Sequence, residues 1–448
     1  EFPIEDLVEG LNVFEGTADR QTCFTFNWGQ WAWYGLMLRI YYDPAERSAP
    51  VASITSPVDG ANLPATPTVE VDAASAAGID RVDVIGRYRA YDVDGDGVFQ
   101  EWQRSYHLLP GDTAMTLRDH VGSATASPYA IDWDTTWIPD QDEGSIELVA
   151  RVRDADGLWT VTDRVTGLSL RRPGVSVQLY EPENVEERYW VRNRWTKSSD
   201  FTVPAGADLT AAVSAQLFTR TWNGINGNAL PGEVWWTRLN GWTLPEYGED
   251  HAYSLDGVDV PIAELRDGSN TVTYFSESSN HGAEVLWPGP AVVVRYDDPT
   301  PSPAYVVASP SDRMAVEGAT VSFAVEAIGP EPITYQWQRD GVDLPGETGS
   351  TLVLPTVAAG DDGALFRCVV TNANGSDTSS AAELTVVLPG PRVTDGRVVL
   401  YTFEEAGGDT IYDRAGQGAA VDLVIGDPSQ VTWSADGLTV DGAASIAS

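Results

Sequence analysis

The chain has 448 residues, about enough for three to four domains of ordinary size, and its formal net charge is −39. A surface this acidic repels phosphate backbones, which argues against nucleic acid as a partner. Runs of about 18 apolar residues are absent, so we expect no membrane insertion within these residues.

Short apolar strands bounded by Gly, Pro, Asp or Asn recur along the chain, for example at 82–91, 145–154 and 319–327. Long stretches with helical periodicity are absent. The pattern predicts an all-β chain of tandem β-sandwich and jelly-roll modules. Proline-rich breaks divide it into five segments, which span 1–44, 51–172, 175–298, 303–388 and 397–448.

The first segment shares a motif with the third. The pattern P-I-x-x-L-x-x-G-x-N occurs at 3–12 and again at 261–270. A tyrosine followed within two residues by Asp-Pro ends both segments, at 41–44 and 296–299. We therefore expect 1–44 to be the C-terminal strands of a jelly-roll-like module whose first part is missing. Such a module needs completion by more of the same polypeptide or by neighbouring copies of the protein.

The second segment opens with V-A-S-I-T-S-P-V-D-G and ends near D-A-D-G-L-W. In these phrases, 51–172 resembles immunoglobulin-type modules of secreted bacterial proteins. The resemblance implies a β-sandwich and an extracellular location.

An acidic motif, D-V-D-G-D-G-V, lies at 92–98 inside this segment. Carboxylates at alternate positions followed by glycine can wrap one hard cation, so the motif predicts a structural Ca²⁺ in a hairpin. A glutamine stands at the twelfth position, where helix–loop–helix calcium sites have a bidentate glutamate. Asp-Gly pairs are also ordinary turn residues between strands. The candidate ligands are Asp92, Asp94, Asp96, the Val98 carbonyl and Glu101.

The third segment contains V-P-I-A-E-L-R-D-G-S-N-T-V at 260–272, through which it resembles galactose-binding-type jelly rolls. That resemblance implies the fold and not a sugar site. Aromatic and polar residues are concentrated in its loop-like parts, where they could stack on and hydrogen-bond a sugar ring, although large aromatics in sandwiches are usually core residues. The candidate ligand-binding residues are Trp222, Asn223, His251, His281 and Trp287, with Trp235, Trp236, Trp242, Tyr247 and Asn280 in the same cluster.

The fourth segment contains Trp337 in Y-Q-W-Q-R-D-G and Cys368 at the end of D-G-A-L-F-R-C. In these motifs, 303–388 resembles an immunoglobulin-like domain of the intermediate kind. Val325 stands where that family has its first cysteine. The resemblance thus implies that Cys368 is a reduced, buried thiol.

The fifth segment carries V-V-L-Y-T-F at 398–403 and Y-D-R-A-G at 412–416. It resembles the beginning of a laminin G-like, concanavalin A-type sandwich. A complete domain of that type needs more strands than 397–448 can hold, so we expect the last module also to be incomplete.

Catalytic motifs such as G-x-S-x-G and H-E-x-x-H are absent, and four histidines leave few general bases. We therefore expect a non-catalytic extracellular scaffold or adhesion region that binds polysaccharide or neighbouring copies of the same protein. One alternative is an accessory region of a large secreted polysaccharide-active enzyme whose catalytic module lies outside this sequence. Another is a subunit of a surface layer or extracellular filament.

Overall fold

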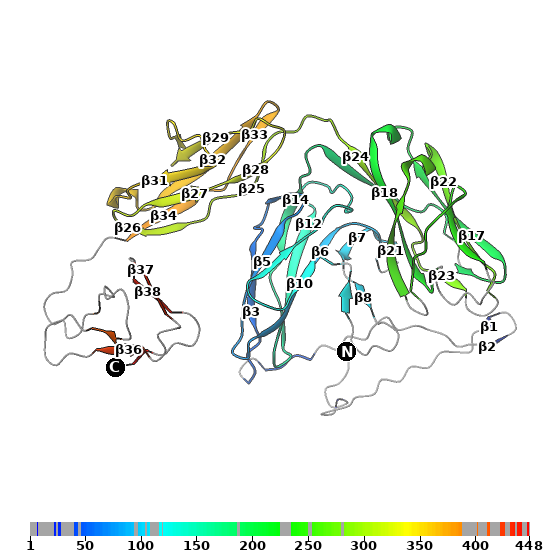
Figure 1. The fold of residues 1–448 in the computed structure, drawn as a ribbon, viewed down its shortest axis with the longest axis horizontal. Coiled ribbons are helices and arrows are strands. Elements are labelled where there is room, and N and C mark those ends of the chain that lie inside the picture. The colour runs from blue at the N-terminus through cyan, green and yellow to red at the C-terminus, as the bar shows by residue number, and fades with distance from the viewer. Residues whose placement is uncertain are drawn as a thin grey trace. The chain divides into compact units, whose positions relative to one another are not determined.

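The computed structural model describes most of residues 46–387, and strands dominate its regular structure (Figure 1). The described ranges are 40–43, 46–93, 97–103, 105–107, 116–118, 120–185, 189–224, 234–249, 253–278 and 282–387, with 7, 22–23, 26–27, 401, 410–412, 422–425, 431–434, 437–440 and 446–447. Within these ranges the only helices are short 3₁₀ turns. The prediction of an all-β chain of tandem sandwiches is confirmed, and no described helix is long and apolar enough to cross a membrane.

The chain forms two compact units. The first comprises Glu1–Pro310, Phe323–Leu352 and Phe366–Ala381, and the second Ser311–Ser322, Val353–Leu365 and Ala382–Ser448. Two sandwiches, between residues 51 and 170 and between 175 and 297, lie wholly within the first unit.

The first sandwich has a sheet of order β10-β6-β12-β14-β4, with β13 on β12 and β7 on β6, and a second of order β11-β5-β3. Its core comes from alternate residues of the central strand β12, where Ile146, Leu148, Ala150 and Val152 are fully buried. The strands are β3 (Val51–Ser56), β4 (Asn62–Leu63), β5 (Thr68–Ala74), β6 (Ile79–Arg89), β7 (Gln100–Gln103), β10 (Gly122–Ala124), β11 (Tyr129–Asp132), β12 (Ile146–Asp154), β13 (Trp159–Val161) and β14 (Val165–Leu170). A separate hairpin joins β8 (Ser105–His107) and β9 (Thr116–Arg118).

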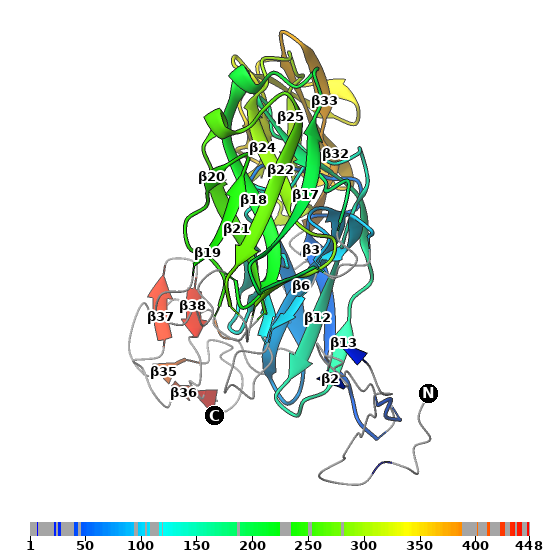
Figure 2. The same ribbon diagram turned by 90° about the vertical axis from the view of Figure 1, so that its right-hand side faces the viewer.

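The second sandwich consists of a six-stranded sheet, β15-β24-β18-β23-β16 with β21 on β18, and a four-stranded sheet, β17-β22-β19-β20 (Figure 2). Its core lies between them and includes Leu217, Val272 and Val292, all fully buried. The strands are β15 (Val175–Tyr180), β16 (Trp190–Val191), β17 (Trp195–Val203), β18 (Ala212–Trp222), β19 (Trp235–Leu239), β20 (Trp242–Thr243), β21 (Tyr253–Val260), β22 (Gly268–Ser276), β23 (Ala283–Val285) and β24 (Ala291–Asp297). The 3₁₀ turn η2 (Leu209–Ala211) precedes β18.

The repeated P-I-x-x-L-x-x-G-x-N motif forms the turn that leads into β22. It contains the 3₁₀ turn η3 (Ile262–Glu264), and Leu265 belongs to the core. The buried Asn270 side chain donates to the carbonyls of Arg266 and Gly268 at 2.8 and 2.9 Å and accepts from the Arg266 N–H at 2.9 Å. The motif is therefore a structural turn. Except for Leu7, its other copy at 3–12 lies outside the described residues.

The fourth segment also contributes strands. In the first unit β25 (Tyr305–Ala308) pairs with β28 (Glu326–Ile328), and β29 (Thr334–Arg339) pairs with β30 (Val342–Asp343). In the second unit β26 (Arg313–Val316) runs parallel to β34 (Ala382–Val387). The remaining elements are β27 (Val321–Ala324), β31 (Thr351–Leu354), η4 (Ala359–Asp361), β32 (Ala364–Asn372) and β33 (Gly375–Thr378).

Trp337 and Cys368 face each other across β29 and β32, and both are fully buried. The Trp337 indole N–H donates to the Gly349 carbonyl at 2.9 Å. Cys368 is a free cysteine, and burial raises the pKa of its thiol to about 11. Val325 is buried as well. The prediction of a reduced, buried thiol is confirmed.

Near the two ends, only short strands are described. They are β1 (Thr22–Cys23), β2 (Phe26–Asn27), β35 (Thr410–Ile411), β36 (Leu423–Ile425), β37 (Val431–Ser434), β38 (Gly437–Val440) and β39 (Ile446–Ala447). Most of 1–44 and 397–448 lies outside the described residues, so the expected incompleteness of both modules stays a prediction.

Candidate functional site

An aromatic row crosses one end of the six-stranded sheet, at β16, β23, β18 and β21. Glu284 lies directly opposite Trp190 on one side and Trp222 on the other, and Trp222 lies opposite Tyr253. Directly opposed residues share a face of the sheet, with Cβ atoms about 4.5–5.5 Å apart. Three aromatic side chains and one carboxylate therefore stand side by side. We call these four residues the aromatic row.

The alternation of buried residues shows which face carries the row. Leu217 and Thr221 on β18 are fully buried, and Leu217 belongs to the core between the two sheets. Val191 and Val285, the neighbours of row residues on β16 and β23, also belong to that core. Successive residues of a strand point to opposite faces. The row consequently lies on the outer face of the six-stranded sheet.

The carboxylate of the row is partly shielded from water. Desolvation by burial raises the pKa of Glu284 above its ordinary value. Beside it, the Arg192 guanidinium carbon lies 4.3 Å from the centroid of the Trp190 ring. The site thus combines flat apolar surfaces with a hydrogen-bond acceptor, which is the chemistry that stacking and orienting a polar ring requires.

The residues predicted to bind a ligand have different positions in the structure. Trp222 belongs to the aromatic row. Asn223 follows it, is fully buried and has a positive φ of 67°, so its backbone turns the chain at the end of β18. Trp287 is 53% exposed and lies two residues beyond β23. His251 and His281 lie outside the described residues.

The other clustered aromatics do not form a single site. Tyr247 is a core residue whose hydroxyl hydrogen-bonds that of Thr237 at 2.7 Å. Trp236 belongs to the other sheet, where its ring stacks on Phe275 with centroids 5.0 Å apart. Sequence reasoning missed Trp190, Glu284 and Tyr253, because only strand register brings them beside Trp222.

The described residues of the acidic motif, 92–93 and 97–98, follow β6, and a hydrogen bond typical of a turn joins Asp92 to Gly97. Asp92 is fully buried, and its carboxylate accepts a hydrogen bond of 2.6 Å from the Gly97 N–H. Val98 is 48% exposed, and Glu101 lies on β7 opposite Tyr88. Asp94 and Asp96 lie outside the described residues. Among residues that are described, no group of three His, Cys, Asp or Glu could hold a metal ion, and the calcium site stays a prediction.

The same turn contacts the sheet that carries the row. The Arg220 guanidinium donates to the Val93 carbonyl. Arg220 lies two residues before Trp222 on β18, so the two side chains share a face about 6.7 Å apart. The structure thus brings the predicted metal loop and a predicted ligand residue to one surface, which neither motif indicated.

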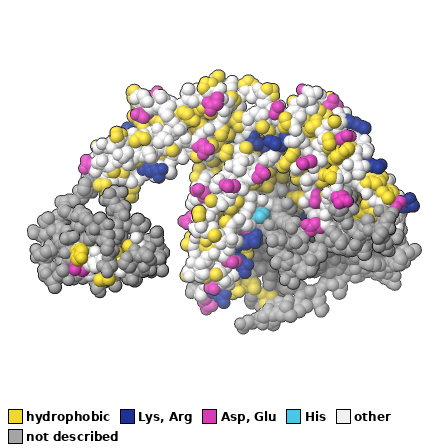
Figure 3. Space-filling model, in the orientation of Figure 1, with side chains coloured by type: hydrophobic (Ala, Val, Ile, Leu, Met, Phe, Trp, Pro, Cys, Tyr) yellow, Lys and Arg dark blue, Asp and Glu magenta, His cyan; other side chains and the backbone are white. Residues whose placement is uncertain are grey.

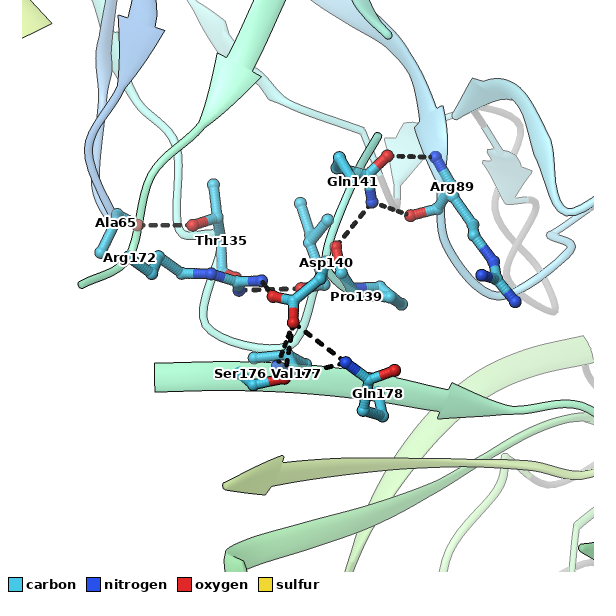
Figure 4. Close-up of polar contacts among 11 residues, drawn as sticks. Ala65, Arg89, Thr135, Pro139, Asp140, Gln141, Arg172, Ser176, Val177 and Gln178 are labelled. Carbon is cyan, nitrogen blue, oxygen red and sulfur yellow. Dashed lines mark hydrogen bonds and ion pairs between the residues drawn. The ribbon is translucent and has the colours of Figure 1, made fainter. Parts of the chain in front are cut away.

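The two sandwiches are joined at Asp140 (Figure 4). One of its carboxylate oxygens accepts from Arg172 at 2.7 Å. The other accepts from the Ser176 hydroxyl, the Val177 N–H and the Gln178 amide at 2.6, 3.1 and 3.0 Å. The Arg172 side chain is 6% exposed. A single carboxylate therefore fixes the chain as it passes from the first sandwich into β15. We call it the Asp140 joint.

An apolar contact continues from this joint. It consists of residues from both sandwiches, Tyr91, Val93, Val177, Leu179, Ala291 and Val293. The Tyr91 hydroxyl donates to the Gly289 carbonyl at 2.8 Å, and Arg89 pairs with Glu181 at 2.8 Å. The contact covers part of the outer face of the six-stranded sheet, at β15 and β24.

A cavity of about 360 Å³ lies at this contact. Aromatic residues of both sandwiches, including Tyr88, Trp137 and Phe218, line it together with Gln103 and His120. Phe218 lies four residues before Trp222 on β18, about 13 Å along the same face. The cavity and the aromatic row therefore belong to one surface of the second sandwich.

A serine, a histidine and an aspartate meet beside the cavity, in an order unsuited to nucleophilic catalysis. The Ser123 hydroxyl donates to Asp83 at 2.5 Å, and the His120 ring nitrogen lies 3.0 Å from the same hydroxyl. In a catalytic triad the histidine stands between serine and aspartate. Here Asp83 also pairs with Arg81 and Arg151 at 2.6 and 2.9 Å. The cluster is a buried ion-pair network.

Comparison with curated proteins finds similarity over short stretches, and no family model matches the chain. It is 38% identical over 101 residues, 22% of this chain, to endoglucanase C of Cellulomonas fimi. It is 33% identical over 142 residues, 30% of this chain, to the human peroxidasin homolog. Each match spans 9% of that relative. A third match, 37% over 71 residues or 16% of this chain, covers 43% of the decoration protein of Escherichia phage T5.

Comparison with solved structures finds other multidomain β proteins. The fibronectin(III)-like modules of Clostridium thermocellum CbhA align over 75% of this chain and 95% of their own, with 9% identity and a TM-score of 0.19. Sidekick-1 immunoglobulin domains 1–5 align over 76% and 59%, with 14% identity and a TM-score of 0.19. Scores this low do not superpose the whole chain on either structure. The chain is a modular all-β protein whose matches include immunoglobulin domains and a bacterial endoglucanase.

Proposed function

We propose that this chain is a non-catalytic extracellular region that binds polysaccharide at the aromatic row. The observation that carries the proposal is the position of Glu284 between Trp190 and Trp222. Aromatic side chains stack on the apolar faces of sugar rings, and a carboxylate between them accepts hydrogen bonds from the ring hydroxyls. Exposed Trp287 offers a further stacking surface beyond β23.

The similarity to endoglucanase C favours a second candidate. In this candidate the chain is the accessory region of a secreted polysaccharide-active enzyme, with its catalytic module elsewhere in the polypeptide. The same binding site then holds the enzyme on its substrate, which raises the local substrate concentration.

We further propose the folds of two segments and one metal site. The sandwich between 175 and 297 is a galactose-binding-type jelly roll, and 397–448 begins a laminin G-like domain. The acidic motif at 92–98 binds Ca²⁺ through Asp92, Asp94, Asp96, the Val98 carbonyl and, beyond the motif, Glu101. The contact between Arg220 and Val93 supports a role for that ion in fixing the loop against the sheet that bears the site.

Binding of the full chain to a panel of polysaccharides, measured by affinity electrophoresis, tests the proposal. We expect Trp222→Ala to weaken the affinity for the bound polysaccharide by about 2 kcal/mol, because tryptophans at the centre of a binding site carry much of its energy. Trp236→Ala is the matched control, since Trp236 lies on the other sheet of the same sandwich.

Two results would contradict the proposal. One is an absence of binding to every polysaccharide in the panel by the folded wild-type chain. The other is an equal loss of affinity in the Trp222 and Trp236 variants, which would place the binding surface elsewhere.

A further inference from the structure

We propose that the aromatic row selects polysaccharides by charge, taking chains of uncharged sugars and rejecting chains that carry carboxylates or sulfates. This inference rests on the proposed function and names its ligand class. The residue that makes the selection is Glu284.

Glu284 lies where any ligand stacked on the aromatic row comes within its reach. It is the direct cross-strand neighbour of both tryptophans in the row. A sugar ring stacked on either indole therefore places its substituents within reach of the carboxylate. Because Glu284 lies between the two tryptophans, it meets a polysaccharide bound in either direction along the row.

The Glu284 carboxylate is the group in the row that acts on a polar ligand. Among the residues that the structure describes, its side chain has no ion-pair or hydrogen-bond partner, and desolvation is the one cause of its raised pKa. A partly buried acceptor without donors gains from hydroxyl groups. A ligand anion at the same position meets a like charge where water screens it poorly.

Among the described residues near the row, two are cationic, and the contacts that each makes do not indicate an anionic ligand. The Arg220 guanidinium is engaged by the Val93 carbonyl. Arg192 lies over the Trp190 ring, 4.3 Å from its centroid, as a cation–π pair. Beyond the row, acidic side chains are spread over the face in Figure 3, and 66 acidic against 27 basic residues repel any polyanion at long range.

The test uses oligosaccharide pairs that differ only at C6, which bears a hydroxymethyl group in one member and a carboxylate in the other. Cellohexaose and β-1,4-galactohexaose are each titrated into the full chain as the neutral oligomer and as the oligomer oxidised to carboxylate at C6. We expect the wild type to bind a neutral oligomer about tenfold more tightly than its oxidised partner. Glu284→Gln, which keeps the shape and removes the charge, should reduce the difference to about twofold.

Asp259→Asn is the matched control. Asp259 lies on the same face of β21 as Tyr253, about 20 Å along the strand, and is exposed. Its variant removes the same charge from the same sheet and should leave the difference unchanged. In 1 M salt the Debye length falls to about 3 Å, so long-range repulsion disappears while the difference set by Glu284 persists.

The outcomes separate this inference from the proposed function. Tighter binding of an oxidised oligomer, or a difference that Glu284→Gln leaves intact, overturns the inference and leaves polysaccharide binding standing. A difference that disappears in 1 M salt also overturns it, because net charge then explains the selection. Failure of the folded chain to bind all four oligomers and every polysaccharide of the panel overturns both proposals. Binding only to panel polysaccharides that carry carboxylates or sulfates overturns the inference alone.

Discussion

At the residue scale, Trp337 and Cys368 lie opposite each other on adjacent strands, and both are fully buried. Trp337 and Cys368 occupy the core positions that their flanking motifs indicate. Asp92 is more instructive, because its carboxylate accepts from the Gly97 N–H as a turn residue does. The same side chain is therefore a turn residue in the structure and a candidate ligand in the metal interpretation of the motif.

We expect Cys368 to react slowly with maleimide in the native chain. A thiol with a pKa of about 11 is about 0.1% thiolate at pH 8, and the thiolate is the nucleophile. The pKa of the Cys368 thiol is higher in the folded chain than in the unfolded chain. Its burial therefore leaves the free energy of unfolding unchanged below about pH 8.5 and lowers it as the pH rises towards 11.

The labelling is measured in a Cys23→Ser variant, so that Cys368 is the one thiol present. Complete labelling in denaturant and slow labelling without it are the expected results. Rapid native labelling at pH 8 would show that the thiol is accessible and would contradict its burial.

At the element scale, alternation and turn residues predicted strands at 82–91 and 145–154, and the structure has β6 at Ile79–Arg89 and β12 at Ile146–Asp154. The aromatic row was not predictable in this way. Its members come from four strands, and Glu284 lies 62 positions from Trp222 in sequence. Their pairing depends on the register that the whole sandwich imposes, which no local pattern encodes.

The Asp140 joint should limit local opening of the chain where it passes from the first sandwich into β15. Asp140→Ala removes the carboxylate from a 6% exposed arginine and from three donors on β15. Charge-assisted hydrogen bonds contribute about 1.5–3 kcal/mol each, so local opening around 172–174 should become at least about tenfold more frequent.

Limited proteolysis of the full chain, followed by mass spectrometry of the fragments, measures that opening. Asp142→Ala is the control, because Asp142 is exposed in the same loop. Equal cleavage rates between 172 and 174 in the wild type and both variants would mean that the apolar contact alone holds the sandwiches together.

At the scale of the whole molecule, Arg220 lies on the same face of β18 as Trp222 of the aromatic row, and its guanidinium donates to the Val93 carbonyl in the acidic motif of the first sandwich. This relation depends on how the Asp140 joint and the apolar contact orient two modules, so composition and motifs gave no sign of it. It also means that order in the loop should influence the surface beside the row.

We therefore expect calcium to stabilise the full chain and to raise the affinity of the aromatic row for its polysaccharide. A ligand at 100 times its Kd stabilises the folded state by about 2.7 kcal/mol, which raises the temperature at which the first sandwich unfolds. Because Ca²⁺ takes oxygen ligands from carboxylates, Asp94→Ala should abolish both saturable calcium binding and the thermal shift. Asp156→Ala, in an exposed Asp-containing turn of the same sandwich, should change neither. Calorimetric titration with calcium measures calcium binding, and its repetition with cellohexaose present measures the coupling to the aromatic row. Thermal unfolding with and without calcium measures the thermal shift. Absence of saturable binding in the wild type, or binding that survives Asp94→Ala, would leave the motif as turn chemistry alone and the row independent of metal.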